Sequence, residues 1–508
     1  MDQFKNAAGI LLCAVLASGS PVPHNPPAAM AASSSWAPPK PNGVAYVTTT
    51  ADGGTTWDVK LNQASGMADH RYSVPLTTRS QFRIASNSKF FAAVALYQLQ
   101  ERGKLNVSAP VTDLFDAADY AKFGRPNATT WCPPLATDPT TCATPTVAQL
   151  LAMSSGLVGL DNCVQALPHL APAARERLFP FCQRAFADYP AIGAYGGNKA
   201  YYFSRFFDAP LLFSPGTRYS YANTGFVLAA YLVEKLSGLA YADYLHERVF
   251  APAGLNATYY DPFDGQFALH EGLAGEFREW VSNETGARLG LGDCRTHMSP
   301  GTYAGAAGVR ASVVDFHAWW HAVMRPDWKV APGLGLGEAS MRALLAPRIS
   351  SGGGAYFAQG MSVVPNPKDP RAFPRLVSYC GGAFCSFTCN LLATAPGGGV
   401  QEMVSAWTNH ETYNLSAALY DGFPHRNDYA VPLGPLADPE DPWFQFAPQA
   451  NGLGQYRTGL TSTAQLAQQL LRKYRPAALL SDGEVARLGA TAAAASQHAA
   501  VAGRVGLL

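Results

Sequence analysis

The sequence predicts an α+β protein whose antiparallel sheet is built from both ends of one domain and flanked by helices, with a mainly helical inserted subdomain. Strand-like runs rich in β-branched and aromatic residues occur at 43–66 and again at 356–409. The long segment between these runs shows helical apolar spacing. Because strands and helices do not alternate along the chain, a parallel βαβ sheet is not expected.

The expected elements follow one another in a simple order. Two strand-like runs flank the sequence ADGG at 51–54, which is a hairpin signal. A helix is expected from about Ser88 to Arg102, where Gly103 ends it. Further helices are expected at 146–157, 224–238 and 311–324, and strands at 356–365, 375–382, 384–396 and 400–409.

The composition is that of a globular protein with no preference for polyanions. The chain has 508 residues, of which 48% are hydrophobic and 11% aromatic, so it can bury a large core. Lysine and arginine number 37 against 36 acidic residues, which leaves a net charge of +1. Nucleic acid is therefore not an expected partner.

The two ends of the chain differ in composition from the part between them. Residues 1–19 combine Lys5 with a short apolar run and small residues, which is typical of a secretory signal peptide. We expect a Pro/Ala/Ser-rich leader at 20–42, a single domain at 43–423, and a C-terminal extension at 424–508 with a helix at 461–474 and a mobile Ala-rich tail. No later run predicts a transmembrane anchor, so the protein is expected to be secreted or to lie in the lumen of the secretory pathway.

The cysteines agree with export. Nine are present, and the eight that follow Cys13 form an even set that favours disulfides. Short loop closure favours pairing Cys132 with Cys142 and Cys163 with Cys182. A metal site is the competing interpretation, but no CxxC or HExxH spacing supports it. Sequons for N-glycosylation occur at Asn106, Asn127, Asn256, Asn283 and Asn414.

Ser86 and Lys89 form the chain's one Ser-x-x-Lys sequence, at the start of the first expected helix. Residues three apart share a helix face, so the lysine can reach the serine hydroxyl. A serine becomes a good nucleophile when a neighbouring base takes its proton, and a lysine in an apolar pocket can exchange protons near neutral pH. The alternative is an N-capping serine beside a solvated lysine.

The segment around this pair resembles the active-site region of the serine β-lactamase-like hydrolases, which include class C β-lactamases, D-alanyl-D-alanine carboxypeptidases and related esterases. The matching residues are FRIASNSK, which begins at Phe82, and the helix exit GKL, which ends at Leu105. A second match is SPGTRYSYAN, which resembles the family's Tyr-x-Asn motif and its approach. The resemblance implies that Tyr221 acts as a general base and acid, and that Asn223 binds the lysine and a substrate carbonyl.

Two further segments resemble the family but depart from its usual residues. In LLAMSSGL, Met153 stands where the family often has histidine. In RLVSYCGG, Tyr379, Cys380 and Gly381 stand where the family usually has Lys-Thr-Gly or His-x-Gly. A tyrosine offers a neutral hydrogen bond in place of a cation, which favours an ester or an uncharged acyl substrate. The N–H of Gly382 is expected to join that of Ser86 as the oxyanion hole.

The sequence therefore predicts a secreted serine hydrolase that acts on a small-molecule or peptide acyl substrate through an acyl-enzyme, without metal or cofactor. An acyltransferase that uses the same site is one alternative. A catalytically silent, glycosylated binding protein on this scaffold is the other. His317 and His321 lie four residues apart, but without an evident third ligand they predict packing or surface roles better than a metal pair. The oligomeric state is not predicted.

Overall fold

The computed structural model describes residues 42–415, except 51–55, 70–72, 160–161, 164–169, 188–197, 262–273, 276, 283–287, 294–302, 353, 368–372, 384–385 and 396–397. The predicted signal peptide, the leader up to residue 41, the helix at 461–474 and the Ala-rich tail lie outside the described residues.

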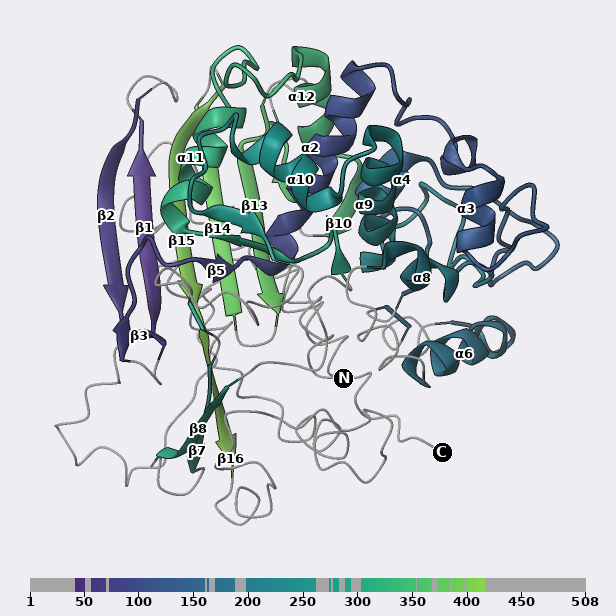
Figure 1. Cartoon of the computed structure of the whole chain (residues 1–508), viewed down its shortest axis with the longest axis horizontal. Helices are drawn as coiled ribbons and strands as arrows, with labels where there is room; N and C mark the ends of the chain where they lie inside the picture. The colour runs from purple at the N-terminus through teal and green to yellow at the C-terminus, as the bar shows by residue number, and fades with distance from the viewer. Residues whose placement is uncertain are drawn as a thin grey trace.

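An eight-stranded antiparallel sheet dominates the fold (Figure 1). Its strand order is β10-β11-β12-β13-β14-β15-β1-β2. The bounds are β1 (Gly43–Thr49), β2 (Asp58–Ser65), β10 (Ile349–Gly352), β11 (Ala355–Phe357), β12 (Ser362–Val364), β13 (Leu376–Ala383), β14 (Ser386–Thr394) and β15 (Val400–Thr408). The N-terminal hairpin thus joins the C-terminal strands through the pair β1–β15, and the predicted fold class is confirmed. One predicted strand was wrong in detail, because the run at 356–365 forms two paired strands, β11 and β12.

Helices pack on one face of this sheet, and the central one is α2 (Ser88–Glu101) (Figure 1). Residues 88–99 of α2 are all buried, because apolar side chains surround the helix on every side. Phe90 and Phe91, for example, contact Trp319 and Trp320. The other helices of this layer are α9 (Asn223–Ser237), α10 (Tyr241–Leu245), α11 (Val313–Val323) and α12 (Glu338–Leu345). The predicted helices at 88–102, 224–238 and 311–324 are therefore confirmed, with shifts of one or two residues at some ends.

The predicted helical subdomain lies beside the sheet (Figure 1). It comprises α3 (Ala117–Lys122), α4 (Val147–Leu151), α6 (Pro172–Ala187) and α8 (Lys199–Ser204). Its helices α3 and α4 pack into the main core, whereas α6 and part of α8 pack into a second, smaller apolar cluster. Leu178, Tyr202 and Phe206 belong to this second apolar cluster, together with the bonded pair Cys163–Cys182.

Shorter elements complete the described part of the chain. A three-stranded sheet in the order β5-β9-β6 leads into α2 and so positions the site described below. The remaining bounds are β3 (Met67–Asp69), β4 (Val74–Pro75), β5 (Phe82–Arg83), β6 (Thr258–Tyr260), β7 (Phe277–Ser282), β8 (Arg288–Asp293), β9 (Val309–Ala311), β16 (His410–Leu415), η3 (Ala85–Asn87), η4 (Val111–Leu114) and η6 (His246–Phe250). No single helix of the described residues has the length and apolar character to cross a membrane, although α9 together with Tyr241–Phe250 passes that test as a pair bent by 82°.

Glu402 on β15 is a buried carboxyl group that makes stability depend on pH. Its side chain is 1% exposed, and burial raises its pKa from the usual 4.5 to about 7. Since the folded-state pKa is above the unfolded one, the folded state holds the proton more tightly. Stability is therefore highest below about pH 4.5 as far as this group is concerned, and it falls as the pH rises toward 7.

We predict that Glu402→Gln raises the free energy of unfolding by about 2–3 kcal/mol at pH 8, because it removes the cost of burying the carboxylate. At pH 4 the variant and the wild type should have the same stability. Urea unfolding at both pH values measures this difference. Glu338→Gln, at an exposed carboxylate on α12, is the control and should show no such gain at pH 8. Equal stability of Glu402→Gln and wild type at pH 8 would contradict the prediction.

Candidate active site

Ser86 lies in the turn between β5 and α2, and the surrounding chain holds this turn in an unusual conformation. Ala85 has a φ of 47°, in a region that residues with a Cβ rarely adopt. The backbone is tied down on both sides, because Ile84 N–H donates to Val309 O at 3.0 Å and Val309 N–H donates to Ser88 Oγ at 3.1 Å. The turn therefore presents Ser86 in a fixed position, with 7% of its surface exposed.

The Ser86 hydroxyl contacts two polar side chains that could move its proton. Lys89 Nζ donates to Ser86 Oγ at 3.0 Å, and Tyr221 OH lies 2.7 Å from the same oxygen. Lys89 is fully buried and also donates to Ala306 O at 2.9 Å. The alternative of an N-capping serine beside a solvated lysine is therefore wrong. The geometry is that of a serine within hydrogen-bond distance of a buried amine and a phenol.

Tyr221 and Asn223 come from the segment that begins α9. Asn223 is the first residue of that helix and is half-buried. Met153, at the position where the family often has histidine, contacts this segment through its sulfur, which accepts a hydrogen bond from Ala222 N–H at 3.3 Å. Ser220 N–H donates to Met153 O at 2.9 Å. The methionine thus still supports the approach to Tyr221, although without a titratable ring.

The third predicted motif lies on β13, which passes directly beside the Ser86 turn. A Cβ placed on Gly381 would lie 2.2 Å from Ile84 O and 3.0 Å from Ser86 N. Glycine is therefore required for the strand to approach this closely. Gly382 follows it and is half-buried, and the role of its N–H in an oxyanion hole stays a prediction.

Tyr379 makes the neighbouring part of the site aromatic and neutral. It is 2% exposed, and its ring centroid lies 5.8 Å from that of Phe357. Burial, reinforced by the nearby phenols of Tyr221 and Tyr219, raises the pKa of Tyr379 well above its usual value. The phenol therefore stays protonated, and it offers no charge to a substrate carboxylate.

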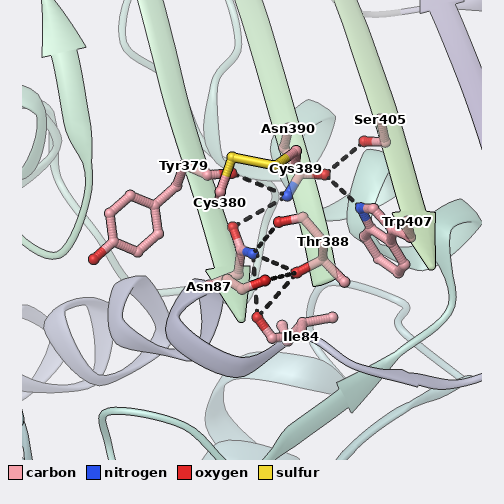
Figure 2. The surroundings of a disulfide bond; sticks show 10 residues. Ile84, Asn87, Tyr379, Cys380, Thr388, Cys389, Asn390, Ser405 and Trp407 are labelled. Carbon is pink, nitrogen blue, oxygen red and sulfur yellow. Dashed lines mark hydrogen bonds between the residues drawn. A yellow bond between two sulfur atoms is a disulfide. The ribbon is translucent and has the colours of Figure 1, made fainter. Parts of the chain in front are cut away.

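The described part of the chain contains three disulfides, one of which lies beside the site. The predicted pairs Cys132–Cys142 and Cys163–Cys182 are confirmed. A third disulfide, Cys380–Cys389, joins β13 to β14 next to Tyr379, as Figure 2 shows. The sequence signal for it was two cysteines on the two runs of one expected hairpin, but this pair was not predicted. Cys294 and Cys385 lie outside the described residues.

The other predicted residues lie away from this site. His317 and His321 are buried on α11 and bind Thr48, so the interpretation as core residues is favoured. Within the described ranges, no group of three or more His, Cys, Asp or Glu side chains could hold a metal ion. Asn106, Asn127 and Asn256 are exposed, whereas Asn283 and the side chain of Asn414 lie outside the described residues.

Known proteins provide a comparison for this arrangement. The model of the beta-lactamase family matches residues 43–413. Penicillin-binding protein 4* of Bacillus subtilis (strain 168) is 27% identical over 210 residues, which are 41% of this chain and 36% of that protein. D-aminopeptidase of Brucella ovis is 34% identical over 107 residues, which are 21% of this chain and 18% of that protein. These matches therefore span well under half of either relative.

Solved structures extend the comparison to the fold. The octameric penicillin-binding protein homologue from Pyrococcus abyssi superposes with a TM-score of 0.50 at 18% identity, over 86% of this chain and 78% of that one. At this level of identity the likeness concerns the fold alone.

Proposed function

Because this chain belongs to the beta-lactamase family, we propose that it is a serine hydrolase that works through an acyl-enzyme on Ser86. The observation that carries the proposal is the contact of Ser86 Oγ with both Lys89 Nζ and Tyr221 OH, at 3.0 and 2.7 Å. A hydroxyl so placed can lose its proton as it attacks a carbonyl carbon. The names of the two curated relatives, a penicillin-binding protein and a D-aminopeptidase, agree with this chemistry.

The proposed reaction has two steps with the same proton route. Ser86 Oγ bonds to the substrate carbonyl carbon, and its proton passes through Lys89 and Tyr221 to the leaving group. The N–H groups of Ser86 and Gly382 are proposed to hold the oxyanion. Water then attacks the acyl-enzyme and gives its proton back to Ser86 by the reverse route, which releases the acid.

We propose an uncharged ester or amide as the substrate class, because Tyr379 places a neutral phenol where relatives use a cation. The ratio of kcat/KM for a neutral p-nitrophenyl ester to that for an analogue with a free carboxylate tests this idea. We expect the neutral ester to be favoured by at least about tenfold, which corresponds to one charge-assisted hydrogen bond. Equal or better turnover of the carboxylate analogue would refute the proposed preference.

A fluorophosphonate probe and p-nitrophenyl esters test the hydrolase function itself. We expect Ser86→Ala to abolish covalent labelling and to lower turnover by about 10³-fold or more. Ser340→Ala, at a buried serine on α12, is the matched control and should keep both activities. If labelling or turnover survives in Ser86→Ala, the proposed function is wrong.

The acyltransferase alternative rests on the same contacts, since an alcohol or amine can replace water in the second step. Added alcohols or amines would then divert the acyl group from free acid to a new ester or amide. Product analysis by mass spectrometry separates the two functions. The silent-scaffold alternative predicts no labelling at Ser86 at all.

We also propose that the protein is exported and glycosylated. Exposure of Asn106, Asn127 and Asn256, together with the disulfides, supports this proposal. Expression in a eukaryotic secretory host followed by treatment with an N-glycosidase tests it. We expect the N-glycosidase to lower the mass of the protein, and to lower it by less in Asn106→Gln than in the wild type. An unchanged mass would refute glycosylation at these sites.

A further inference from the structure

A continuous line of buried hydrogen bonds runs from the Ser86 turn across the sheet to α11. Asn390 Nδ2 donates to Asn87 Oδ1 at 3.1 Å, and Ser405 Oγ donates to Asn390 Oδ1 at 2.6 Å. Ser405 Oγ also lies 3.0 Å from His317 Nε2, and His317 Nδ1 lies 2.9 Å from Thr48 Oγ1. None of these five residues is more than 5% exposed. Figure 2 shows the part that joins Asn87 to Ser405.

Neighbours that can only donate or only accept determine the orientation of the Asn390 amide. The Trp407 indole N–H can only donate, and it lies 2.8 Å from Asn390 Oδ1. The Tyr379 carbonyl can only accept, and it lies 3.4 Å from Asn390 Nδ2. The amide nitrogen of Asn390 therefore faces Asn87, whose Oδ1 must accept.

The Asn87 amide, oriented by Asn390, in turn forms hydrogen bonds with the turn that contains Ser86. With Oδ1 used as an acceptor, its Nδ2 faces Thr388 Oγ1 at 2.8 Å, Ile84 O at 3.1 Å and Thr388 O at 3.2 Å. The two carbonyls can only accept, and the Thr388 hydroxyl donates its own hydrogen to Ile84 O at 3.2 Å, so it also accepts from Nδ2. Asn87 thus links β14 to the backbone on the other side of Ser86, across the strained Ala85.

The donors and acceptors at the His317 end of the line are assigned in the same way. Ser405 gives its one hydrogen to Asn390, so its oxygen must accept from His317 Nε2–H. Burial, together with the nearby His321, holds the pKa of His317 well below its usual range, so the ring is neutral and its Nδ1 is an acceptor. Thr48 then donates to Nδ1, and its oxygen is left to accept from His321 Nε2, 3.3 Å away.

We propose that Asn390 and His317 are positioning residues for the reaction at Ser86. They act through this line of hydrogen bonds, in which each side chain donates to the next one toward the Ser86 turn. The proposal rests on the proposed hydrolase function. A backbone in a disfavoured conformation persists only where its surroundings restrain it. The buried amides of Asn87 and Asn390 restrain the turn at Ala85 and Ser86. A small displacement of a nucleophile costs a large factor in rate, so loosening this restraint should lower kcat more than it changes KM.

Steady-state turnover of a p-nitrophenyl ester and the rate of fluorophosphonate labelling test the proposal. We expect Asn390→Leu and His317→Leu to lower kcat by about 10- to 100-fold with little change in KM. His317→Gln, which can still donate and accept, should recover most of the loss. Gln98→Met is the control, because it removes a fully buried carboxamide from α2, the helix that follows Ser86, and Gln98 binds Leu334 O and Arg248 O there.

Nitrogen-15 NMR of the histidine rings provides a readout that stability alone does not move. We expect His317 in the wild type to be the neutral Nε2–H tautomer, and its signals to shift in Asn390→Leu. An Nδ1–H tautomer, or kcat values of the two leucine variants equal to that of Gln98→Met, would overturn the proposal. Activity that survives in Ser86→Ala would instead refute the hydrolase function, so the two failures are distinguishable.

Discussion

Lys89→Met is expected to lower kcat/KM for a p-nitrophenyl ester by about 10²- to 10⁴-fold, which is the usual contribution of a proton-transferring side chain. The physical reason is that Lys89 Nζ lies 3.0 Å from Ser86 Oγ and is fully buried. Methionine keeps the length and apolar contacts of the side chain but cannot exchange a proton. Steady-state kinetics of the purified variant measures the loss.

The control for this change is Lys199→Met. Lys199, on α8 of the helical subdomain, is also buried, with 9% of its surface exposed, and it binds Glu234 Oε1 of α9 at 2.9 Å. Its replacement should affect stability and leave kcat/KM nearly unchanged. If Lys89→Met keeps more than about a tenth of the activity, Lys89 does not supply the general base or acid of the reaction.

Gly381→Ala is expected to lower activity by about 100-fold and to destabilise the protein by about 1–3 kcal/mol. The new Cβ would lie 2.2 Å from Ile84 O, so β13 and the Ser86 turn must move apart. Both are backbone segments in the core and cannot yield without loss of packing. Kinetics with a p-nitrophenyl ester and urea unfolding measure the two effects.

Gly337→Ala is the matched control for Gly381→Ala. A Cβ at Gly337 would also meet an oxygen, Glu101 Oε1 at 3.0 Å, but that atom ends a flexible side chain. The φ of Gly337, −85°, is accessible to alanine, so only a small effect on activity and stability is expected. If Gly381→Ala were as active as Gly337→Ala, the close approach of β13 to Ser86 would not matter for the reaction.

Local sequence signals were sufficient for the elements that carry the site. The apolar run after Ser86 and the stop at Gly103 predicted α2 almost to the residue, because α2 is buried on every side. The strands β1 and β2 and the strands after residue 374 were predicted because their runs are rich in β-branched and aromatic residues. The split of 356–365 into β11 and β12 was missed, because both halves are apolar and no proline marks the turn.

Long-range contacts were much harder to predict. The disulfide Cys380–Cys389 depends on the register of β13 with β14, and spacing along the chain does not specify that register. The contact of the Met153 sulfur with Ala222 joins segments 69 residues apart. The hydrogen bond between Asn390 and Asn87 joins residues 303 apart, and each residue alone resembles an ordinary polar residue in a strand or a turn.

The sequence by itself determined the fold class and the candidate catalytic residues Ser86, Lys89 and Tyr221, because periodicity and short motifs are local properties of the chain. Only the tertiary structure decided that Lys89 is buried against Ser86 rather than solvated. Only the tertiary structure also showed that Gly381 leaves room for the nucleophile's turn. The physical reason is that burial and close approach depend on which distant segments pack together, and sequence spacing carries no measure of either.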